Sequence, residues 1–511
     1  MRPGHCSSPA SNESLLQDIF QENQRAAHNL LSKLGHTVAG RVYVYTGHAF
    51  DWTSKLKGCF NEDAYEWNIY GADLFFARQM IAPSAPWRTW NASHATLFVV
   101  PALLGLSAKW DTRWWEMPSI SRDAKSDCKP FSYSHALDEL MAALHRSVHW
   151  QQRKPHLFFS GGWLNMKPSR NPAQQRTRDM IFHQSHVVVA HFERGGPYTA
   201  NMKTVHYPYV SLCSTASRQA AKTSRAWKTS ALFSSTSWLE PLKGQPISFH
   251  MRGQIDDRPA YEARAMTCAA LQGVVSSGYM ICSAVRDNQT LTQLSRQNGS
   301  EGVSVHGQPF HVCPATVGST ASHLNGGPCA AAAPRSKASA SLQAQQGGRC
   351  PGLVSCLTDV SISSYCDELS HSAMSLMVRG DTPSSSRLYD AMDLGILPVT
   401  VVPRLRNTNR SPYMHQYQEN ASLLETMSPL VRWRDFVADA TETSIDGIAR
   451  QLQALLPGAP EASNASTWCE LERKRRAMLR WLPFTSWHHD PFTTSMGILA
   501  QTSILIDNGV V

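Results

Sequence analysis

Short apolar segments of strand length alternate with longer amphipathic segments along this chain, and the alternation occurs in two successive series. This pattern predicts parallel β-sheets with helices between the strands, which is the α/β class. In the first series the strand-like segments are residues 41–45, 95–101, 155–159 and 186–192, and the helical segments are 11–34, 64–80 and 134–149. In the second series the strand-like segments are 247–251, 374–378 and 396–402, and the helical segments are 260–272, 383–394, 443–456 and 469–481.

The length of 511 residues predicts more than one hydrophobic core, because a single core rarely exceeds about 300 residues. We expect a helical extension over residues 1–39, a first α/β domain over 40–212, a linker over 213–240, a second α/β domain over 241–457 and a helical tail over 458–511. Residues 296–352 are rich in Gly, Ala, Ser and Gln and nearly lack large apolar side chains. They are therefore expected to form a disordered insertion in the second domain.

The chain is basic, with 48 Lys and Arg against 39 Asp and Glu and a formal net charge of +9. A basic chain attracts phosphate groups, whether they belong to nucleic acids, nucleotides or lipids. The densest basic run, Arg473 to Arg476, is expected to be the solvated face of a helix. Charge is the only feature that favours a nucleic-acid-binding protein, so no nucleic-acid partner is expected.

Seven N-x-S/T sequons occur, whereas chance would supply about three, and the excess favours the lumen of the secretory pathway. Besides the sequon at Asn12, six are the candidate glycosylation sites: Asn91, Asn288, Asn298, Asn409, Asn420 and Asn464. The 12 cysteines contain no C-x-x-C pair, which argues against a zinc ribbon and leaves disulfides open. Residues 1–17 lack an apolar signal core, and no run of 18 apolar residues occurs. Attachment to a membrane is thus expected only through an anchor missing from this start or through a partner.

The segment Ser375 to Val402 (SLMVRGDTPSSSRLYDAMDLGILPVTVV) predicts a strand, a polar loop, a helix and a second strand. Thr382 is expected to be the N-cap of the helix and Pro383 its first residue, with Gly395 ending it. The polar loop follows the carboxyl end of a strand, where open α/β sheets bind ligands. Free N–H groups and serine hydroxyls at the helix start suit a pyrophosphate, and Arg379 and Arg387 would add charge.

An alternative reading of the same segment is a well-capped surface helix with an ion pair between Arg387 and Asp390. Such pairs are common on helix surfaces and contribute little to stability. Spacing alone does not decide between the two readings.

This segment resembles the C-terminal signature of exostosin-like glycosyltransferases, glycosyltransferase family 47. The chain keeps the family's Arg-Gly, Arg, acidic, Ala, Gly and Pro-Val positions as Arg379, Gly380, Arg387, Asp390, Ala391, Gly395, Pro398 and Val399. It has Val378 where the family usually has Pro. Weaker similarities run in the same order through residues 41–52, 68–101, 155–162, 186–208 and 247–264, with Asn91 and Lys203 as departures. The resemblance thus covers residues 40–455, apart from the insertion.

The resemblance implies a GT-B architecture, in which two Rossmann-like domains face a cleft. It implies an inverting transferase that moves a sugar from a nucleotide sugar, usually a UDP-sugar, to a glycan or glycoprotein acceptor. The family uses hexoses, pentoses and glucuronic acid, and its members typically sit in the Golgi lumen. The nucleotide-sugar site would then comprise Arg252, Gly253, Arg379, Gly380, Asp381, Thr382, Ser384, Ser385, Ser386, Arg387 and Asp390, with Asp390 accepting hydrogen bonds from the ribose.

Inverting transfer needs positive groups for the departing diphosphate and a base for the acceptor hydroxyl. The arginines and the helix start would serve the diphosphate, and no D-x-D sequence is present, so no metal or other cofactor is expected. Glu193 follows a strand of the first domain and matches a glutamate of the family, which makes it the candidate catalytic residue, as base or as an acceptor-positioning group. His156, His186 and His191 are weaker candidates for the base. The departures from the family pattern leave open a catalytically inactive glycan-binding or scaffold relative.

Overall fold

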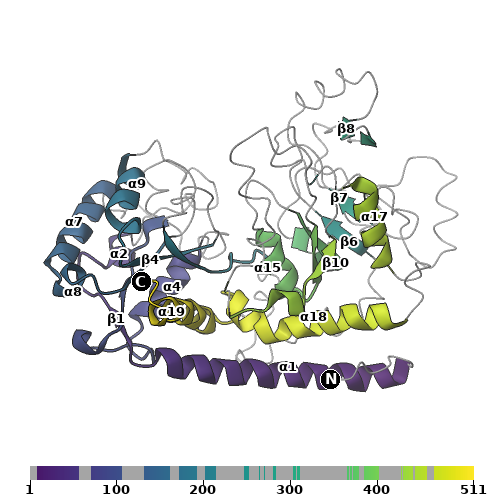
Figure 1. Ribbon diagram of the computed structural model, residues 1–511, viewed down its shortest axis with the longest axis horizontal. Helices are drawn as coiled ribbons and strands as arrows, with labels where there is room; N and C mark the ends of the chain where they lie inside the picture. The colour runs from purple at the N-terminus through teal and green to yellow at the C-terminus, as the bar shows by residue number, and fades with distance from the viewer. Residues whose placement is uncertain are drawn as a thin grey trace. The chain divides into compact units, whose positions relative to one another are not determined.

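The computed structural model contains two compact units, each of which holds one parallel β-sheet (Figure 1). The structure describes residues 9–56, 71–105, 132–160, 172–192, 202–213, 247–251, 264, 267, 270, 280–282, 303–305, 308–310, 365–366, 369–370, 372–378, 385–401, 427, 430–440, 444–456 and 465–511. One unit comprises Asn23–Leu212, Glu419–Arg432 and Leu479–Val511, and is called the β1–β5 unit. The other comprises Met1–Glu22, Cys213–Gln418 and Trp433–Met478, and is called the β6–β12 unit.

The β1–β5 unit has five parallel strands that lie side by side in the order in which the chain makes them. They are β1 (Val42–Val44), β2 (Leu97–Val100), β3 (His156–Phe159), β4 (Val187–His191) and β5 (Lys203–His206). Strands β2, β3 and β4 are buried along their whole length, as expected for apolar runs in a parallel sheet covered on both faces. The four strands expected in this half are thereby confirmed, and β5 is an additional one.

The helices of the β1–β5 unit include α2 (Trp52–Lys55), α4 (Ala72–Ile81), η1 (Ala92–His94), α7 (Tyr133–Arg146), α8 (Val148–Gln151), α9 (Pro172–Thr177), η4 (Arg178–Phe182) and α19 (Pro491–Asp507). Four of them begin at a side chain that caps them: α2 at Asp51, η1 at Asn91, α7 at Ser132 and α19 at Asp490. Ser132 caps α7 by accepting the backbone N–H of His135. The helix expected over 134–149 is confirmed by α7 as far as Arg146, but it is not continuous, because Ser147 leaves helical geometry (φ −75°, ψ 123°) and divides α7 from α8.

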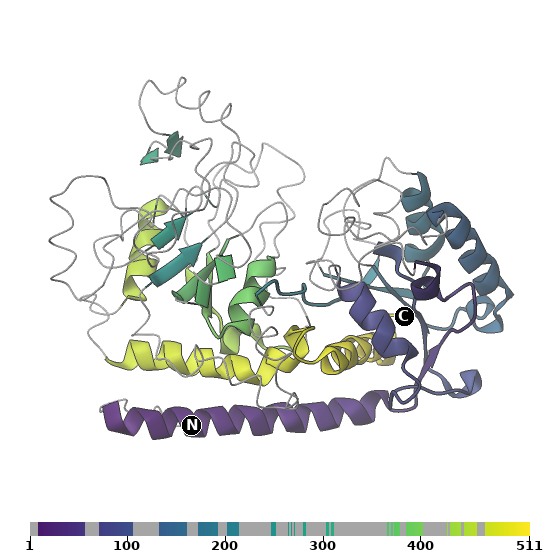
Figure 2. The same cartoon turned by 180° about the vertical axis from the view of Figure 1, so that it is seen from behind.

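The β6–β12 unit has a second parallel sheet, in the order β12-β11-β10-β6-β7. Its strands are β6 (Ile247–Met251), β7 (Met280–Cys282), β10 (Ser372–Val378), β11 (Leu397–Val401) and β12 (Ala438–Ala440). Figure 2 shows α15 (Ser386–Asp393) beside β10, and the unit also contains η13 (Trp433–Asp435), α17 (Ile445–Ala454) and residues of α18 (Ala465–Thr485). The short antiparallel pair β8 (Val303–Val305) and β9 (Gln308–Phe310) falls within the segment 296–352, whose other residues lie outside the described ones.

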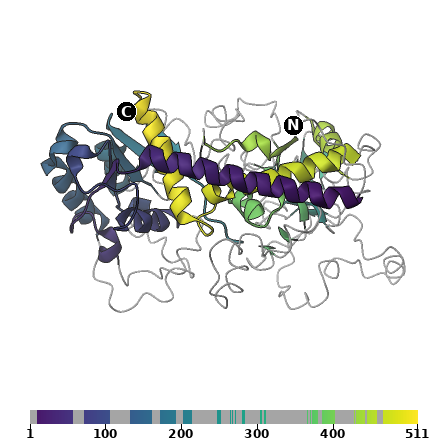
Figure 3. The same cartoon turned by 90° about the horizontal axis from the view of Figure 1, so that it is seen from below.

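The long helix α1 (Pro9–Val38) is one unbroken helix, seen along its whole length in Figure 3. It confirms the helix expected over residues 11–34. Among the residues that the structure describes, no helix combines the length and the hydropathy that a membrane span requires.

The basic run Arg473–Arg476 is not the solvated helix face that the sequence predicts. Arg475 is fully buried and Arg476 nearly so, and both guanidinium groups bond Glu472 Oε1 at 2.9–3.2 Å. Of the four basic residues, only Arg473 is solvated as expected, and it pairs with Glu470 at the surface. The run lies on α18 where that helix packs against its own unit, so tertiary burial outweighs the preference of charged side chains for water.

Candidate functional site

The strand order of the β6–β12 sheet reverses between β6 and β10. From β6 the chain goes outward to β7 on one side, and from β10 it goes outward to β11 and β12 on the other. Ser375 of β10 pairs with His250 of β6, so the two strands run parallel and their carboxyl ends lie at the same edge. Connections that diverge at such a point leave a crevice outside the carboxyl ends, where open α/β sheets bind their ligands.

The arginine and glycine residues expected at the nucleotide-sugar site follow these two strands directly in the chain. Arg252 and Gly253 come after Met251, the last residue of β6, and Arg379 and Gly380 come after Val378, the last of β10. These four residues lie outside the described ones, as do Asp381, Thr382 and Ser384. The described residues that precede them, Met251 and Val378, end neighbouring parallel strands at the point where the strand order reverses, a relationship that the sequence did not reveal.

The helix after this loop begins at Ser386, three residues later than expected, and its N-cap is Ser385 rather than Thr382. Ser385 has extended backbone geometry (φ −144°, ψ 128°) and its hydroxyl accepts a hydrogen bond from Arg387 Nη1 at 3.2 Å. Serine side chains compete for backbone hydrogen bonds and favour caps over helix interiors, which explains the late start. Ser385, Ser386 and Arg387 are therefore close together at the helix start, as the sequence predicts.

The far end of α15 is held in place by α18. Gly395 has φ +70° and ends the helix, as predicted, with Ile396 N–H donating to Ala391 O at 2.8 Å. The carbonyl oxygen of Gly395 accepts a hydrogen bond from Arg475 Nη1 at 3.3 Å. A buried guanidinium thus meets the negative end of the helix dipole.

Asp390 is buried, and both of its carboxylate oxygens accept hydrogen bonds from residues of its own unit. Its Oδ1 accepts the backbone N–H of Cys213 at 3.4 Å, and its Oδ2 accepts the hydroxyl of Tyr365 at 3.1 Å. Cys213 and Cys366 form a disulfide beside these contacts. Asp390 therefore ties together three segments that are distant in sequence, and Cys213 is anchored although the segment 213–240 was expected to be a linker.

The histidines considered as bases in the β1–β5 unit lie in its core. His156 opens β3 and is therefore at the amino edge of the sheet, away from the carboxyl edge. Its Nε2 lies 2.9 Å from the hydroxyl of Tyr45 and its Nδ1 lies 2.5 Å from Lys154 O. Burial lowers the pKa of His156 to about 3, and burial also lowers the pKa of His186. His156 and His186 therefore stay neutral and structural, and His191 is buried as well.

Glu193 follows the last residue of β4, His191, by two positions and lies outside the described residues. It thus comes after the carboxyl end of a strand, as the sequence suggests.

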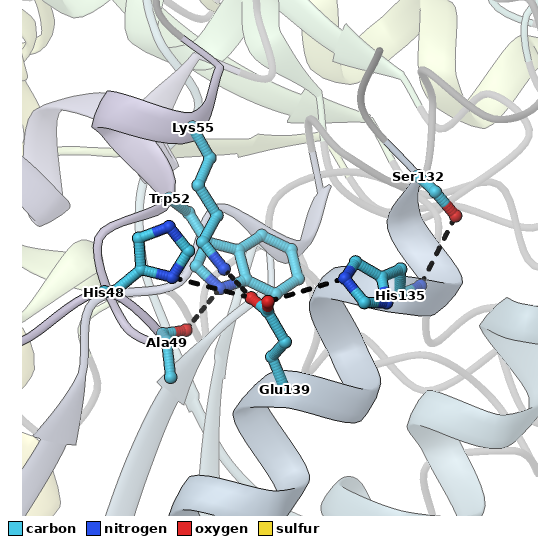
Figure 4. Close-up of polar contacts among 7 residues, drawn as sticks. All are labelled: His48, Ala49, Trp52, Lys55, Ser132, His135 and Glu139. Carbon is cyan, nitrogen blue, oxygen red and sulfur yellow. Dashed lines mark hydrogen bonds and ion pairs between the residues drawn. The ribbon is translucent and has the colours of Figure 1, made fainter. Parts of the chain in front are cut away.

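A charged cluster that the sequence did not single out lies at the same carboxyl edge (Figure 4). Glu139 of α7 pairs with Lys55 at the end of α2, and it also meets His48 and His135. The Oε2 atom lies 3.8 Å from His48 Nδ1, and Oε1 lies 3.4 Å from His135 Nε2. The hydrogen bond from Lys55 is the main reason that the pKa of Glu139 is lowered. Lys55 is nearly buried, whereas both imidazoles are exposed.

Topology places this cluster at the carboxyl edge. His48 is four residues beyond the end of β1, and Glu139 lies in the first half of α7, which leads back to the amino end of β3. Among the described residues, no group of three or more His, Cys, Asp or Glu side chains is arranged to hold a metal ion.

No protein-family model and no curated protein matches this chain. Solved structures with a similar course of the chain include sucrose-phosphate synthase from Thermosynechococcus elongatus, at 12% identity and a TM-score of 0.30 over 75% of this chain and 81% of that one. The α,α-trehalose-6-phosphate synthase of Burkholderia multivorans matches at 8% identity and a TM-score of 0.30, over 73% of this chain and 69% of that one. The N-terminal domain of Candida albicans trehalose-6-phosphate phosphatase matches at 8% identity and a TM-score of 0.34, over 92% of this chain and 96% of that one.

Proposed function

We propose that this chain is a nucleotide-sugar-dependent glycosyltransferase of the exostosin type, which transfers a hexosyl, pentosyl or glucuronosyl group from a UDP-sugar to a glycan with inversion. The observation that carries the proposal is the reversal of strand order between β6 and β10. The two Arg-Gly pairs that the family resemblance assigns to the donor, Arg252-Gly253 and Arg379-Gly380, directly follow these two strands.

The chemistry of the donor side follows from the residue types. A departing UDP carries negative charge on its diphosphate, and guanidinium groups and the N–H groups of a helix start stabilise that charge. Arg252, Arg379, Ser386 and Arg387 supply such groups, and no metal ion is part of the proposal. The buried contact from Arg475 to the Gly395 carbonyl fixes the far end of the helix that carries Ser386 and Arg387.

The acceptor side is proposed for the carboxyl edge of the β1–β5 sheet. Glu193 is the proposed carboxylate there, as base or as a group that positions the acceptor. The disulfide Cys213–Cys366 and the disulfide-bonded Cys469 support an oxidising compartment, and we propose the Golgi lumen.

Isothermal titration with UDP tests the donor assignment. Arg387→Ala should weaken UDP binding by about 2–4 kcal/mol if the guanidinium makes a desolvated phosphate contact. Arg473→Ala is the matched control, because that arginine pairs with Glu470 at the surface and should leave UDP affinity unchanged. Equal UDP affinity of wild type and Arg387→Ala would remove the assignment.

A catalytically inactive glycan-binding relative is the second candidate, and the contacts of Asp390 favour it. Both oxygens of this carboxylate are engaged by Cys213 and Tyr365, although the family resemblance assigns it to the ribose. UDP release from UDP-galactose, UDP-xylose and UDP-glucuronic acid separates the two candidates. The enzyme should release UDP faster when a glycan acceptor is present, whereas the binding relative should release none.

A further inference from the structure

His186 is a buried imidazole, 5% exposed, and in the described part of the chain neither of its ring nitrogens has a hydrogen-bond partner. The ring of Trp150 makes a T-shaped contact with it, with centroids 4.5 Å apart, and the ring of His156 lies 5.5 Å away. Buried polar groups almost always have a partner, because an unsatisfied one costs stability. His186 thus differs from His156, whose two nitrogens contact Tyr45 and Lys154.

Two positively charged side chains act on this imidazole. Burial is the main cause that lowers the pKa of His186, and the charges of Arg153 and Lys203 lower it further. Lys203 Nζ donates to the carbonyl oxygen of Ser185, the residue before His186. The backbone N–H of Arg153 donates to Trp150 O at 2.9 Å, which fixes the turn next to the ring that packs on His186. Both cations therefore lie beside the unpartnered ring.

No carboxylate balances these two charges. Among the residues that the structure describes, neither Arg153 nor Lys203 forms an ion pair. No acidic group is among the charges that shift the pKa of His186. Two cations and an imidazole N–H without an acceptor attract an anion that can accept hydrogen bonds from all three groups.

These groups gather at the amino edge of the β1–β5 sheet. Arg153 precedes β3, His186 precedes β4 and Lys203 begins β5, and these three strands are neighbours. The backbone N–H of His156 donates to His186 O at 2.8 Å, which joins the starts of β3 and β4. The acceptor side proposed above is at the carboxyl edge, so a ligand at His186 would occupy a different site of the same unit.

We propose that Arg153, His186 and Lys203 bind a tetrahedral oxyanion, the phosphate or sulfate group of a ligand, at this amino edge. The guanidinium and the ammonium hold the anion by charge-assisted hydrogen bonds, and neutral His186 donates one ring N–H to it. Donors that come from the starts of three strands suit the several oxygens of phosphate or sulfate better than the two of a carboxylate. The inference does not depend on the proposed glycosyl transfer.

Isothermal titration of the full chain with inorganic phosphate, sulfate and acetate, at one ionic strength set with NaCl, measures the site. The variants are His186→Phe, which keeps a ring against Trp150, Lys203→Gln, and Arg153→Asn, since asparagine tolerates the φ of +55° at this position. Lys33→Gln is the matched control, because it removes one exposed positive charge from α1. In wild type, the ¹H–¹³C signal of His186 Cε1, identified by its loss in His186→Phe, follows the same titrations.

Wild type should bind phosphate and sulfate saturably, with acetate weaker by about tenfold or more, and the His186 signal should move as the site fills. His186→Phe, Arg153→Asn and Lys203→Gln should each weaken phosphate binding by about tenfold or more, and Lys33→Gln should stay within about twofold of wild type. Glucose 6-phosphate identifies the source of the group. Tighter binding than that of inorganic phosphate indicates an ester on a larger molecule, equal binding indicates the free anion, and both support the site.

Two results would overturn the inference. One is phosphate affinity that is equal in wild type, His186→Phe and Lys203→Gln, or binding that does not saturate in wild type. The other is saturable binding that is lost in Arg387→Ala but kept in His186→Phe, which would assign the anion to the start of α15 and leave the proposed donor site standing.

Discussion

The hydroxyl of Tyr45 lies 2.9 Å from Nε2 of His156, and the same hydroxyl lies 2.9 Å from Oγ of Ser147. These groups join β1, β3 and the junction of α7 with α8 inside an otherwise apolar core. Burial raises the pKa of Tyr45 to about 12 and lowers that of His156 to about 3, so both stay neutral across the physiological range. The hydrogen bond between Tyr45 and His156 therefore fixes how the two side chains are oriented in the core without burying a charge.

Acidification should destabilise the fold through His156. In the unfolded chain a histidine takes up a proton near pH 6.5, whereas the folded site does so only near pH 3. The unfolded state thus binds more protons between these values, and the contribution of His156 to stability is lost as pH falls, at up to about 1.4 kcal/mol per pH unit.

Urea unfolding of wild type and His156→Gln at pH 7, 5.5 and 4.5 measures this effect. The difference between their free energies of unfolding should shrink as pH falls, because the variant lacks the titrating group. The exposed variant His135→Gln serves as the control. A difference that stays constant with pH would contradict the assignment.

Loss of the Cys213–Cys366 disulfide should destabilise the β6–β12 unit by about 2–4 kcal/mol, because the bond restricts the unfolded chain. The single variants Cys213→Ser and Cys366→Ser and the double variant should have the same melting temperature, since each lacks the same bond. Calorimetry under non-reducing conditions tests this. A double variant much less stable than either single one would show that the thiols matter separately.

Substitutions in the basic run of α18 should differ sharply in their cost. Arg475→Met removes a buried partner of Glu472 and the bond to Gly395, and should cost about 3–5 kcal/mol. Arg473→Ala removes a surface pair and should cost less than about 1 kcal/mol. Denaturant unfolding of the two variants compares them directly, and equal costs would refute the burial argument.

Asn91 should carry an N-linked glycan when the chain is made in a secretory host. Its side-chain Oδ1 accepts hydrogen bonds from the hydroxyl and the N–H of Ser93, at 2.7 and 3.0 Å, and the residue is exposed on a short turn. The neighbouring Trp90 is 66% exposed, with Arg88 over one face of its ring at 3.8 Å. The other ring face would be available to the first sugar.

Mass spectrometry of the peptide that contains Asn91, before and after enzymatic removal of N-glycans, checks this prediction. Asn91→Gln and Ser93→Ala should both abolish the modification, and Ser93→Thr should keep it. An unmodified Asn91 in wild type secreted by such a host would contradict the prediction.

Much of the fold could be predicted because its strands are apolar runs with ordinary boundaries. The apolar runs over 186–192 and 396–402 each predict a strand, and β4 and β11 confirm them. The short strands β7 and β12 were not predicted, because their sequences, MIC and ADA, lack the run of β-branched and aromatic residues that marks β1 (VYV). The order of the strands in each sheet could not be predicted, because it depends on which segments pair and not on the residues within each segment.

Part of the candidate site could likewise be predicted from the sequence, and part of it could not. The residues around Arg387 were found from one continuous segment, where capping and charge lie within a few positions. The Glu139 cluster was missed because its four members are up to 91 positions apart, from His48 to Glu139, and each is an ordinary surface residue on its own. The burial of Arg475 was missed for the same reason, since its partner Gly395 lies 80 positions earlier.

The bond between Cys213 and Cys366 closes a covalent ring over a sequence separation of 153 residues. A protease that cuts the backbone once anywhere inside this ring will not release a fragment, and the nicked chain will keep its full mass until it is reduced. Maturation by a cut in this region would therefore leave no trace on a non-reducing gel. The ring also includes β6 and β7, so both strands would stay tethered to the rest of their sheet after such a cut.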